Sequence, residues 1–539
     1  WFGSIDINQF AGGTVTIAGD RQTLPEKQAQ KDLVSGSSDR IEITDKTGAI
    51  SITIKFDRQL KISVQDARSF GINKFQIYVP MLETEIKPGT RAKLGVSISA
   101  NSPQDDSPAR IEIDPSKIIS TFDGFGGNFV YDIESPVTDF NLRTLKLTWA
   151  RLGMDLTTWE PTNDNQLPAE PIENWGKLID TATSPIRRRF HLDKRVFDLS
   201  KERTIVSVWR LPEWLYDQPL PLARGSQRDT AGTVKQAMWP ELIECVTTYL
   251  IHLKNNYGVE PSLFSFNEPD YGIYLTLNAE EMSLLYQQMG KAFENAGLKT
   301  KLMLPDSASL RDGLELMKPS LNSPATMKYI GAIAYHVWSG EQDLWDSWAK
   351  IAETHKLPLL VTEAGLDANA WEDFSYNTPI SALRLAERYI QLLRSSRAQA
   401  IIEWEWTGDY SFYNHDGGGY RPTSRYWMMW QLTKNTPTNG RIVATTSNKL
   451  SVNAALVISG EKDAPAFSLH ISNAGQSRKI AVNGLPTIAK KITIVTTDFF
   501  TDKPPTVKEI NFPIHELELN VPGGSLVTVT TMDVEQPKR

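Results

Sequence analysis

The stretch Ser262-Leu-Phe-Ser-Phe-Asn-Glu-Pro269 starts as a short apolar run and ends in polar residues. Such a run is typical of a buried strand of a parallel sheet, and Pro269 ends it because proline has no backbone donor. Farther on, Asn278 and Glu281 have the spacing of a helix-capping pair, and Gly297 stands where a helix-ending glycine is expected. The stretch therefore predicts a strand followed by a helix over 278–296.

The same alternation of strand and helix extends through the middle of the chain. Apolar runs alternate there with helical patterns, as in a series of strand–helix units. The predicted strands are 121–129, 145–152, 204–209, 262–267, 300–304, 330–336, 358–363 and 400–406, and further helices are predicted at 240–255 and 380–396. About eight units in some 320 residues predict a closed (β/α)8 TIM barrel.

The two ends of the chain differ from this middle part. Of the 15 tryptophans, all except Trp1 lie between Trp149 and Trp430. Both ends contain short alternating runs typical of sandwich strands, and the polar segment 101–108 is the predicted linker. We therefore expect an α/β fold in three parts: an N-terminal β-sandwich domain over 1–108, the (β/α)8 TIM barrel over 109–435 and a C-terminal side β-sandwich over 436–539.

Composition narrows the function classes. The 539 residues carry a net charge of −7, which argues against a nucleic-acid partner. Cys245 is the only cysteine, which excludes an intrachain disulfide and a cysteine metal cluster. No apolar run reaches the roughly 18 residues of a membrane span. The lone cysteine fits a cytosolic protein as well as an exported one. Because the chain opens on Trp1, we expect a processed bacterial protein, secreted or periplasmic and monomeric, whose signal peptide has been removed.

Two carboxylates lie at the ends of predicted strands, namely Glu268 and Glu363. Active sites of TIM barrels form at the carboxyl ends of the strands, so these side chains are expected to face each other. Such a pair suits glycoside hydrolysis, where one carboxyl group protonates the departing oxygen and the other attacks the sugar or activates water. Either glutamate can instead be solvated or paired with arginine, and an Asn-Glu-Pro tripeptide alone also arises by chance.

Further polar residues are expected around this pair. Asn267 is placed to hydrogen-bond a sugar hydroxyl. Alternation along 333–337 turns His336 inward, although it can also be a satisfied core histidine. Arg151, at its own strand end, can hold a carboxylate in its charged form or form a structural ion pair.

Tryptophans at the strand ends supply a surface on which sugar rings can stack. Alternation along 402–406 puts Trp404 and Trp406 on one face and Glu403 and Glu405 on the other, and leaves open which face looks into the barrel. The tryptophans at or just beyond strand ends are Trp209, Trp214, Trp338, Trp371, Trp404 and Trp406.

These motifs together resemble a clan A retaining glycosidase, most closely glycoside hydrolase family 30, which includes glucosylceramidases and endo-xylanases. The resemblance begins at Phe122-Asp-Gly-Phe-Gly-Gly-Asn-Phe129 and continues through Val206-Ser-Val-Trp-Arg-Leu-Pro-Glu-Trp214. It implies that Glu268 is the acid/base and Glu363 the nucleophile, and that the side sandwich borrows a strand at 110–113. The substrate-binding residues that motifs and resemblance together suggest are Asn267, Arg151, Trp209, His336, Trp338, Trp371, Trp406 and Glu405.

Two features depart from that family. Trp338 stands where such enzymes often place a tyrosine that hydrogen-bonds the nucleophile, and an indole can only donate. The first 108 residues have no counterpart in the plain family architecture; we expect them to support the barrel rather than to bind carbohydrate, since aromatic platform residues are few there.

The sequence therefore predicts a retaining β-glycoside hydrolase that acts on an oligo- or polysaccharide by double displacement, with endo action and without a cofactor or metal. Two alternatives remain: a non-catalytic carbohydrate-binding protein on a barrel scaffold, and a transglycosylase of another clan A family.

Overall fold

The computed structural model divides the chain into two compact units, Trp1–Asp106 and Ser107–Arg539. No helix among the described residues is long and apolar enough to cross a membrane. The structure describes residues 3–29, 32–70, 74–80, 93–102, 105, 107–130, 135–163, 172–218, 220, 232–271, 274–338, 341–366, 375–415, 420–460, 466–485, 491–501, 503–511 and 516–537.

The first unit is one sheet in the order β1-β6-β5-β4-β2-β3, with β7 paired to β5. The long strand β5 pairs with β6 through its second half and with β7 through its first half. Apolar residues of both halves, among them Ile54 and Ile62, belong to one buried core, so the sheet folds over that core. The elements are β1 (Gly3–Asp6), α1 (Ile7–Phe10), β2 (Thr14–Ile17), β3 (Asp20–Thr23), β4 (Asp32–Thr44), β5 (Ser51–Asp66), β6 (Lys74–Tyr78) and β7 (Val96–Asn101).

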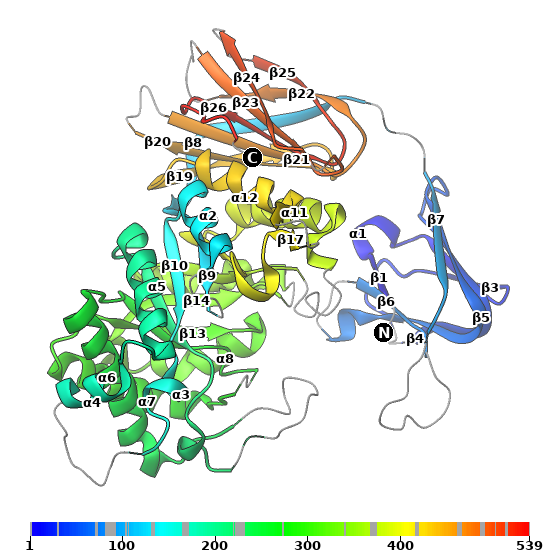
Figure 1. Ribbon diagram of the computed structural model, residues 1–539. Coiled ribbons are helices and arrows are strands. Elements are labelled where there is room, and N and C mark those ends of the chain that lie inside the picture. The colour runs from blue at the N-terminus through cyan, green and yellow to red at the C-terminus, as the bar shows by residue number, and fades with distance from the viewer. Residues whose placement is uncertain are drawn as a thin grey trace. The chain divides into compact units, whose positions relative to one another are not determined.

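Within the described part of the second unit, eight parallel strands close into a barrel, so the predicted fold class is confirmed (Figure 1). β14 covers the same residues as the strand predicted at 330–336. The strands are β9 (Gly124–Phe129), β10 (Trp149–Gly153), β11 (Thr204–Val208), β12 (Leu263–Phe266), β13 (Lys301–Ser307), β14 (Ile330–His336), β15 (Leu359–Ala364) and β16 (Ala400–Glu403).

Helices follow the strands, and α7 begins and ends where the capping residues of the sequence predict. Asn278 and Glu281 form a reciprocal capping box at the start of α7, and Gly297 follows it at φ +68°. The helices are α2 (Pro136–Thr144), α3 (Leu156–Trp159), α4 (Ile172–Ile179), α5 (Pro185–Ser200), α6 (Trp239–Tyr257), α7 (Ala279–Asn295), α8 (Leu310–Leu321), α9 (Pro324–Met327), α10 (Trp345–His355), α11 (Pro379–Ser395) and α12 (Ser424–Lys434).

A second sheet packs on α11 and α12 and shares their core (Figure 1). Gln431 on α12 donates to the carbonyls of Val495 and Leu526 in that sheet. The sheet takes β8 from the chain just before the barrel, where β8 lies antiparallel to β19. Its strands are β8 (Ala109–Phe122), β19 (Gly440–Ser447), β20 (Val452–Ser459), β21 (Ala466–Asn473), β22 (Arg478–Asn483), β23 (Lys491–Asp498), β24 (Thr506–Asn511), β25 (Glu516–Val521) and β26 (Ser525–Thr530), and a hairpin after the barrel comprises β17 (Tyr413–His415) and β18 (Tyr420–Pro422).

Candidate active site

The two glutamates singled out in the sequence meet at the carboxyl end of the barrel. Glu268 follows β12 and Glu363 lies near the end of β15, and both are almost fully buried. His336, at the end of β14, lies between them: its Nδ1 is 2.7 Å from Glu268 Oε1 and 3.3 Å from Glu363 Oε2. One oxygen of each carboxyl group and a ring nitrogen of His336 all lie within 4.8 Å of one another.

His336 is surrounded by acidic groups on both sides of its ring. Its Nε2 is 3.2 Å from Asp306 Oδ1, so each ring nitrogen faces a carboxylate. Burial alone would lower the pKa of His336, but the charge of Glu363 and the contacts with Asp306 and Glu268 raise this pKa to about 10. At neutral pH the ring is therefore an imidazolium that donates from both nitrogens.

The oxygens of Glu363 are held by three donors. Arg151 Nη1 lies 2.7 Å from Oε1, while the Trp338 indole donates to Oε2 at 2.9 Å and His336 approaches the same oxygen. Burial raises the pKa of Glu363 above its usual value, whereas the charges of His336 and Arg151 oppose that rise. Donors aimed at both oxygens favour the carboxylate form, which is the form a nucleophile needs.

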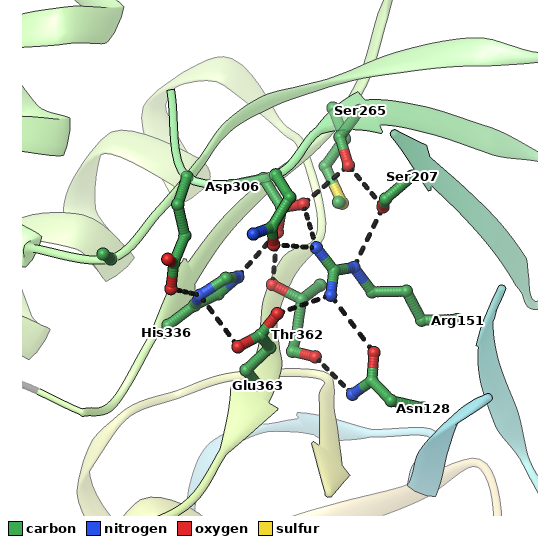
Figure 2. A network of polar contacts seen from close by, with 12 residues as sticks. Asn128, Arg151, Ser207, Ser265, Asp306, His336, Thr362 and Glu363 are labelled. Carbon is green, nitrogen blue, oxygen red and sulfur yellow. Dashed lines mark hydrogen bonds and ion pairs between the residues drawn. The ribbon is translucent and has the colours of Figure 1, made fainter. Parts of the chain in front are cut away.

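Arg151 is the centre of this polar network (Figure 2). It is fully buried, and besides Glu363 it contacts Asp306 Oδ2 and Asn267 Oδ1, both at 2.7 Å from Nη2. Its Nε also donates to Ser207 Oγ at 2.9 Å. The two roles foreseen for Arg151 thus coincide, because the same guanidinium orients Glu363 and forms a structural ion pair.

Asp306, at the end of β13, is the main site residue that sequence reasoning missed. It accepts hydrogen bonds from Ser265 Oγ and Thr362 Oγ1, both at 2.6 Å, in addition to its contacts with Arg151 and His336 (Figure 2). Burial would raise the pKa of Asp306, but the charge of Arg151 and the contacts with His336 hold this pKa well below its usual range. Its position two residues after the predicted strand 300–304 was the signal that could have revealed it.

Asn128 was also missed as a site residue. Its Nδ2 donates to the carbonyl groups of Thr362 and Glu403, at 2.9 and 3.1 Å, and its Oδ1 accepts from Arg151. It therefore ties β9 to β15 and β16 and fixes one side of the arginine.

Aromatic side chains line the same end of the barrel. Trp209 and Trp404 lie with ring centroids 5.8 Å apart and form one cluster with Tyr376 and Tyr410, against which Trp338 packs. The Arg151 guanidinium lies 4.3 Å above the ring of Trp209. Of the tryptophans in the segment 402–406, it is thus Trp404 that reaches the mouth.

Trp406 and Glu405 are placed differently from expectation. Both are fully buried; Trp406 packs against Phe129, and the Glu405 carboxylate lies against Gly408. The predicted substrate contact of Trp406 is therefore corrected. That contact was expected from the resemblance to family 30, and alternation had left open which face looks into the barrel; β16 ends at Glu403, so alternation does not govern the residues after it.

Glu403 and Trp214 both contact other parts of the protein rather than the two glutamates. Glu403 turns toward the helices, where it pairs with Arg425 at 2.5 Å and accepts from Tyr389. The indole of Trp214 donates to the carbonyl of Glu160 at 2.9 Å. Trp371 lies outside the described residues.

Glu268, His336 and Glu363 also have the composition of a metal site. A cation there would have to displace the proton with which His336 Nδ1 contacts both glutamates, at 2.7 and 3.3 Å. The positive charges of His336 and Arg151 already compensate the carboxylates. This arrangement can act by itself as an acid and nucleophile pair, without demanding a cation.

The high pKa of His336 predicts a pH-dependent stability. Relative to an unfolded value of 6.5, a folded pKa of about 10 stabilises the fold fully below pH 6.5, and this stabilisation is lost as the pH rises to 10. We expect the melting temperature of the wild type to fall several degrees more over this interval than that of His336→Gln, measured by calorimetry. Parallel curves for the two proteins would contradict the charged state of His336.

Comparisons with known proteins agree on the fold. No protein-family model matches the chain, and no curated protein is similar in sequence. Among solved structures, a glycoside hydrolase family 30 subfamily 8 xylanase from Clostridium acetobutylicum is 16% identical at a TM-score of 0.59, over 78% of this chain and 99% of that one. A family 30 endoxylanase from Clostridium papyrosolvens is 15% identical at 0.61, over 79% and 99%.

An endo-β1,6-glucanase shows the same fold, with 15% identity and a TM-score of 0.54 over 78% of this chain and 93% of its own. The shared fold is a barrel with an attached β-region, and the covered share matches the unit Ser107–Arg539 in size. The expected likeness to family 30 structures is therefore confirmed at the level of the fold.

Proposed function

We propose that this chain, which has the fold of the family 30 glycoside hydrolases, is a retaining β-glycoside hydrolase with Glu363 as nucleophile and Glu268 as acid/base. The observation that carries the proposal is the close approach of the two carboxyl groups, which have oxygens within 4.8 Å of each other. Carboxyl groups about 5–5.5 Å apart suit double displacement, whereas inverting enzymes need about 6.5–9.5 Å to admit a water molecule.

In the first step, a Glu363 oxygen attacks the anomeric carbon and forms a glycosyl ester. The bond to the leaving oxygen breaks, and Glu268 gives that oxygen its proton. The hydrogen bond from His336 Nδ1 to Glu268 Oε1, at 2.7 Å, orients the acid and leaves its Oε2 to carry the proton that is transferred. Arg151 and Trp338 hold the nucleophile in one orientation.

In the second step, Glu268 is a carboxylate and acts as a base. It removes a proton from water, the water oxygen attacks the anomeric carbon, and the ester bond to Glu363 breaks. Glu363 leaves as a carboxylate and Glu268 is protonated again, so the cycle closes. The sugar is released with the anomeric configuration of the substrate, because two inversions have occurred.

The substrate that suits the mouth is a neutral β-linked oligo- or polysaccharide. Trp209 and Trp404 are only 7% and 8% exposed, and the half-buried Trp338 that packs beside them offers the aromatic surface for sugar C–H groups. The net charge of −7 does not favour a polyanion. We propose endo action on such a chain by a monomeric protein exported to the periplasm or the medium. Chromatography of early products tests the endo action, since an endo enzyme releases oligosaccharides of several lengths.

A panel of β-linked glucans, xylans, galactans and mannans tests the proposed function. We expect at least one glycan to release reducing ends, and ¹H NMR of the first product to show the retained anomer. Release of the inverted anomer would contradict the mechanism. Binding of a glycan without any hydrolysis across the panel would instead favour a carbohydrate-binding protein on a barrel scaffold.

A further inference from the structure

Two segments of the chain bring Glu268 and Asp306 together at the mouth of the barrel. Glu268 lies in the loop that follows β12. Asp306 lies at the end of β13. Among the described residues, the ladder between these strands ends at the pair Phe264 and Leu302. Other contacts must therefore fix the relative position of the two segments where the chemistry takes place.

Both segments also have an unfavourable backbone conformation at these residues. Glu268 has φ +46° and Asp306 has φ +58°, in the left-handed region that side chains with a Cβ rarely adopt. The N–H group of Glu268 donates to the carbonyl group of Asp306 at 3.0 Å. A left-handed backbone at a non-glycine residue persists only where the surroundings hold it.

Asp270 supplies a second connection between the two segments. Its Oδ1 accepts from the N–H of Ala308 at 3.0 Å, and its Oδ2 accepts from the N–H of Ser309 at 2.9 Å. The connection lies two residues beyond Glu268 on one segment and two or three residues beyond Asp306 on the other. Hydrogen bonds to a carboxylate are roughly twice as strong as neutral ones, so the two segments are firmly joined.

His336 depends on this connection because it bridges the side chains of both residues. Its Nδ1 contacts Glu268 Oε1 at 2.7 Å and its Nε2 contacts Asp306 Oδ1 at 3.2 Å. A shift of either backbone would break one of these contacts. We propose that Asp270 is a positioning residue for the acid/base Glu268, acting through the two backbone N–H groups; this inference rests on the proposed function.

The test compares substrates that need the acid with substrates that do not. In Asp270→Ala, we expect kcat/KM to fall about 10- to 100-fold for glycosides with poor leaving groups, because a displaced acid protonates them badly. For the 2,4-dinitrophenyl glycoside of the same sugar we expect a change of less than about threefold, since that leaving group needs no proton. Asp270→Asn should lie between, because its amide keeps only one acceptor oxygen.

Glu341 provides a matched control, because it binds the start of α8, which follows directly after Ser309. Its Oε2 accepts from the N–H of Leu310 at 2.8 Å and so caps α8, and it comes from the segment after β14 rather than from the segment of Glu268. Glu341→Ala should affect both kinds of substrate equally. Equal losses on both substrates in Asp270→Ala and Asp270→Asn, or no loss in either, would overturn the proposed role.

A second measurement does not require activity. Hydrogen exchange of the full chain should show faster exchange at the N–H groups of Ala308 and Ser309 in Asp270→Ala than in the wild type or in Glu341→Ala. Unchanged exchange would overturn the positioning role of Asp270 even if activity fell. A wild type that cleaves no glycoside would contradict the proposed function, and exchange alone would then decide whether Asp270 holds the two segments together.

Discussion

Replacing Glu363 by glutamine is expected to reduce turnover by about 10⁴-fold or more, because removal of a nucleophile leaves only binding and the remaining polar groups. The amide has nearly the shape of the carboxylate and can still accept from Arg151, which lies 2.7 Å from the native oxygen. The loss would therefore report chemistry rather than unfolding. Steady-state kinetics on the best glycoside of the panel measure it.

Glu403 supplies the matched control for this prediction. It is as buried as Glu363 and is the last residue of β16, the strand that pairs with β15. Its side chain faces outward, away from the site, and pairs with Arg425. Glu403→Gln should lower the melting temperature and leave kcat of the folded protein within a few-fold of the wild type. Glu363→Gln with undiminished activity would remove the nucleophile from the account.

Replacing Glu268 by alanine is expected to separate substrates by their leaving group. Activity on poor leaving groups should fall about 10²- to 10⁴-fold, the usual contribution of general acid catalysis, while formation of the glycosyl ester from a 2,4-dinitrophenyl glycoside should change little. The second step then lacks its base, so the ester accumulates and the burst of product becomes visible in stopped-flow experiments.

Azide provides the control for the role of Glu268. It attacks the ester without needing a base, so it should restore turnover of the activated glycoside in Glu268→Ala and give a glycosyl azide of retained configuration. It should have no such effect on the wild type. A uniform loss on all substrates that azide does not restore would contradict the acid/base assignment.

Much of the fold was predictable because local patterns and the fold agree. Residues 330–336 form a strand as predicted, since a short apolar run between turn signals has few other solutions. The capping pair at Asn278 and Glu281 likewise fixed the start of α7. By contrast, strand alternation does not apply beyond Glu403, which is why Trp404 rather than Trp406 reaches the mouth.

The candidate site was predictable only where chemistry and position coincide. Glu268, Glu363 and His336 stand at strand ends and have side chains suited to glycoside hydrolysis, so their meeting could be foreseen. Asp306 escaped notice because its role depends on four partners from different strands, and no local pattern encodes such a network. The outward turn of Glu403 toward Arg425 depends in the same way on a contact that is distant in the sequence.

The most direct test of the central claim is the site of covalent attachment. A 2-deoxy-2-fluoro glycoside with a 2,4-dinitrophenyl leaving group slows the second step, so the glycosyl ester can be isolated and its peptide sequenced by mass spectrometry. The account predicts one sugar per chain, attached to Glu363 and absent from Glu363→Gln. Attachment of the sugar to another residue would contradict a retaining mechanism through Glu363. So would a wild type that stays active in the presence of the fluorosugar that matches its preferred substrate.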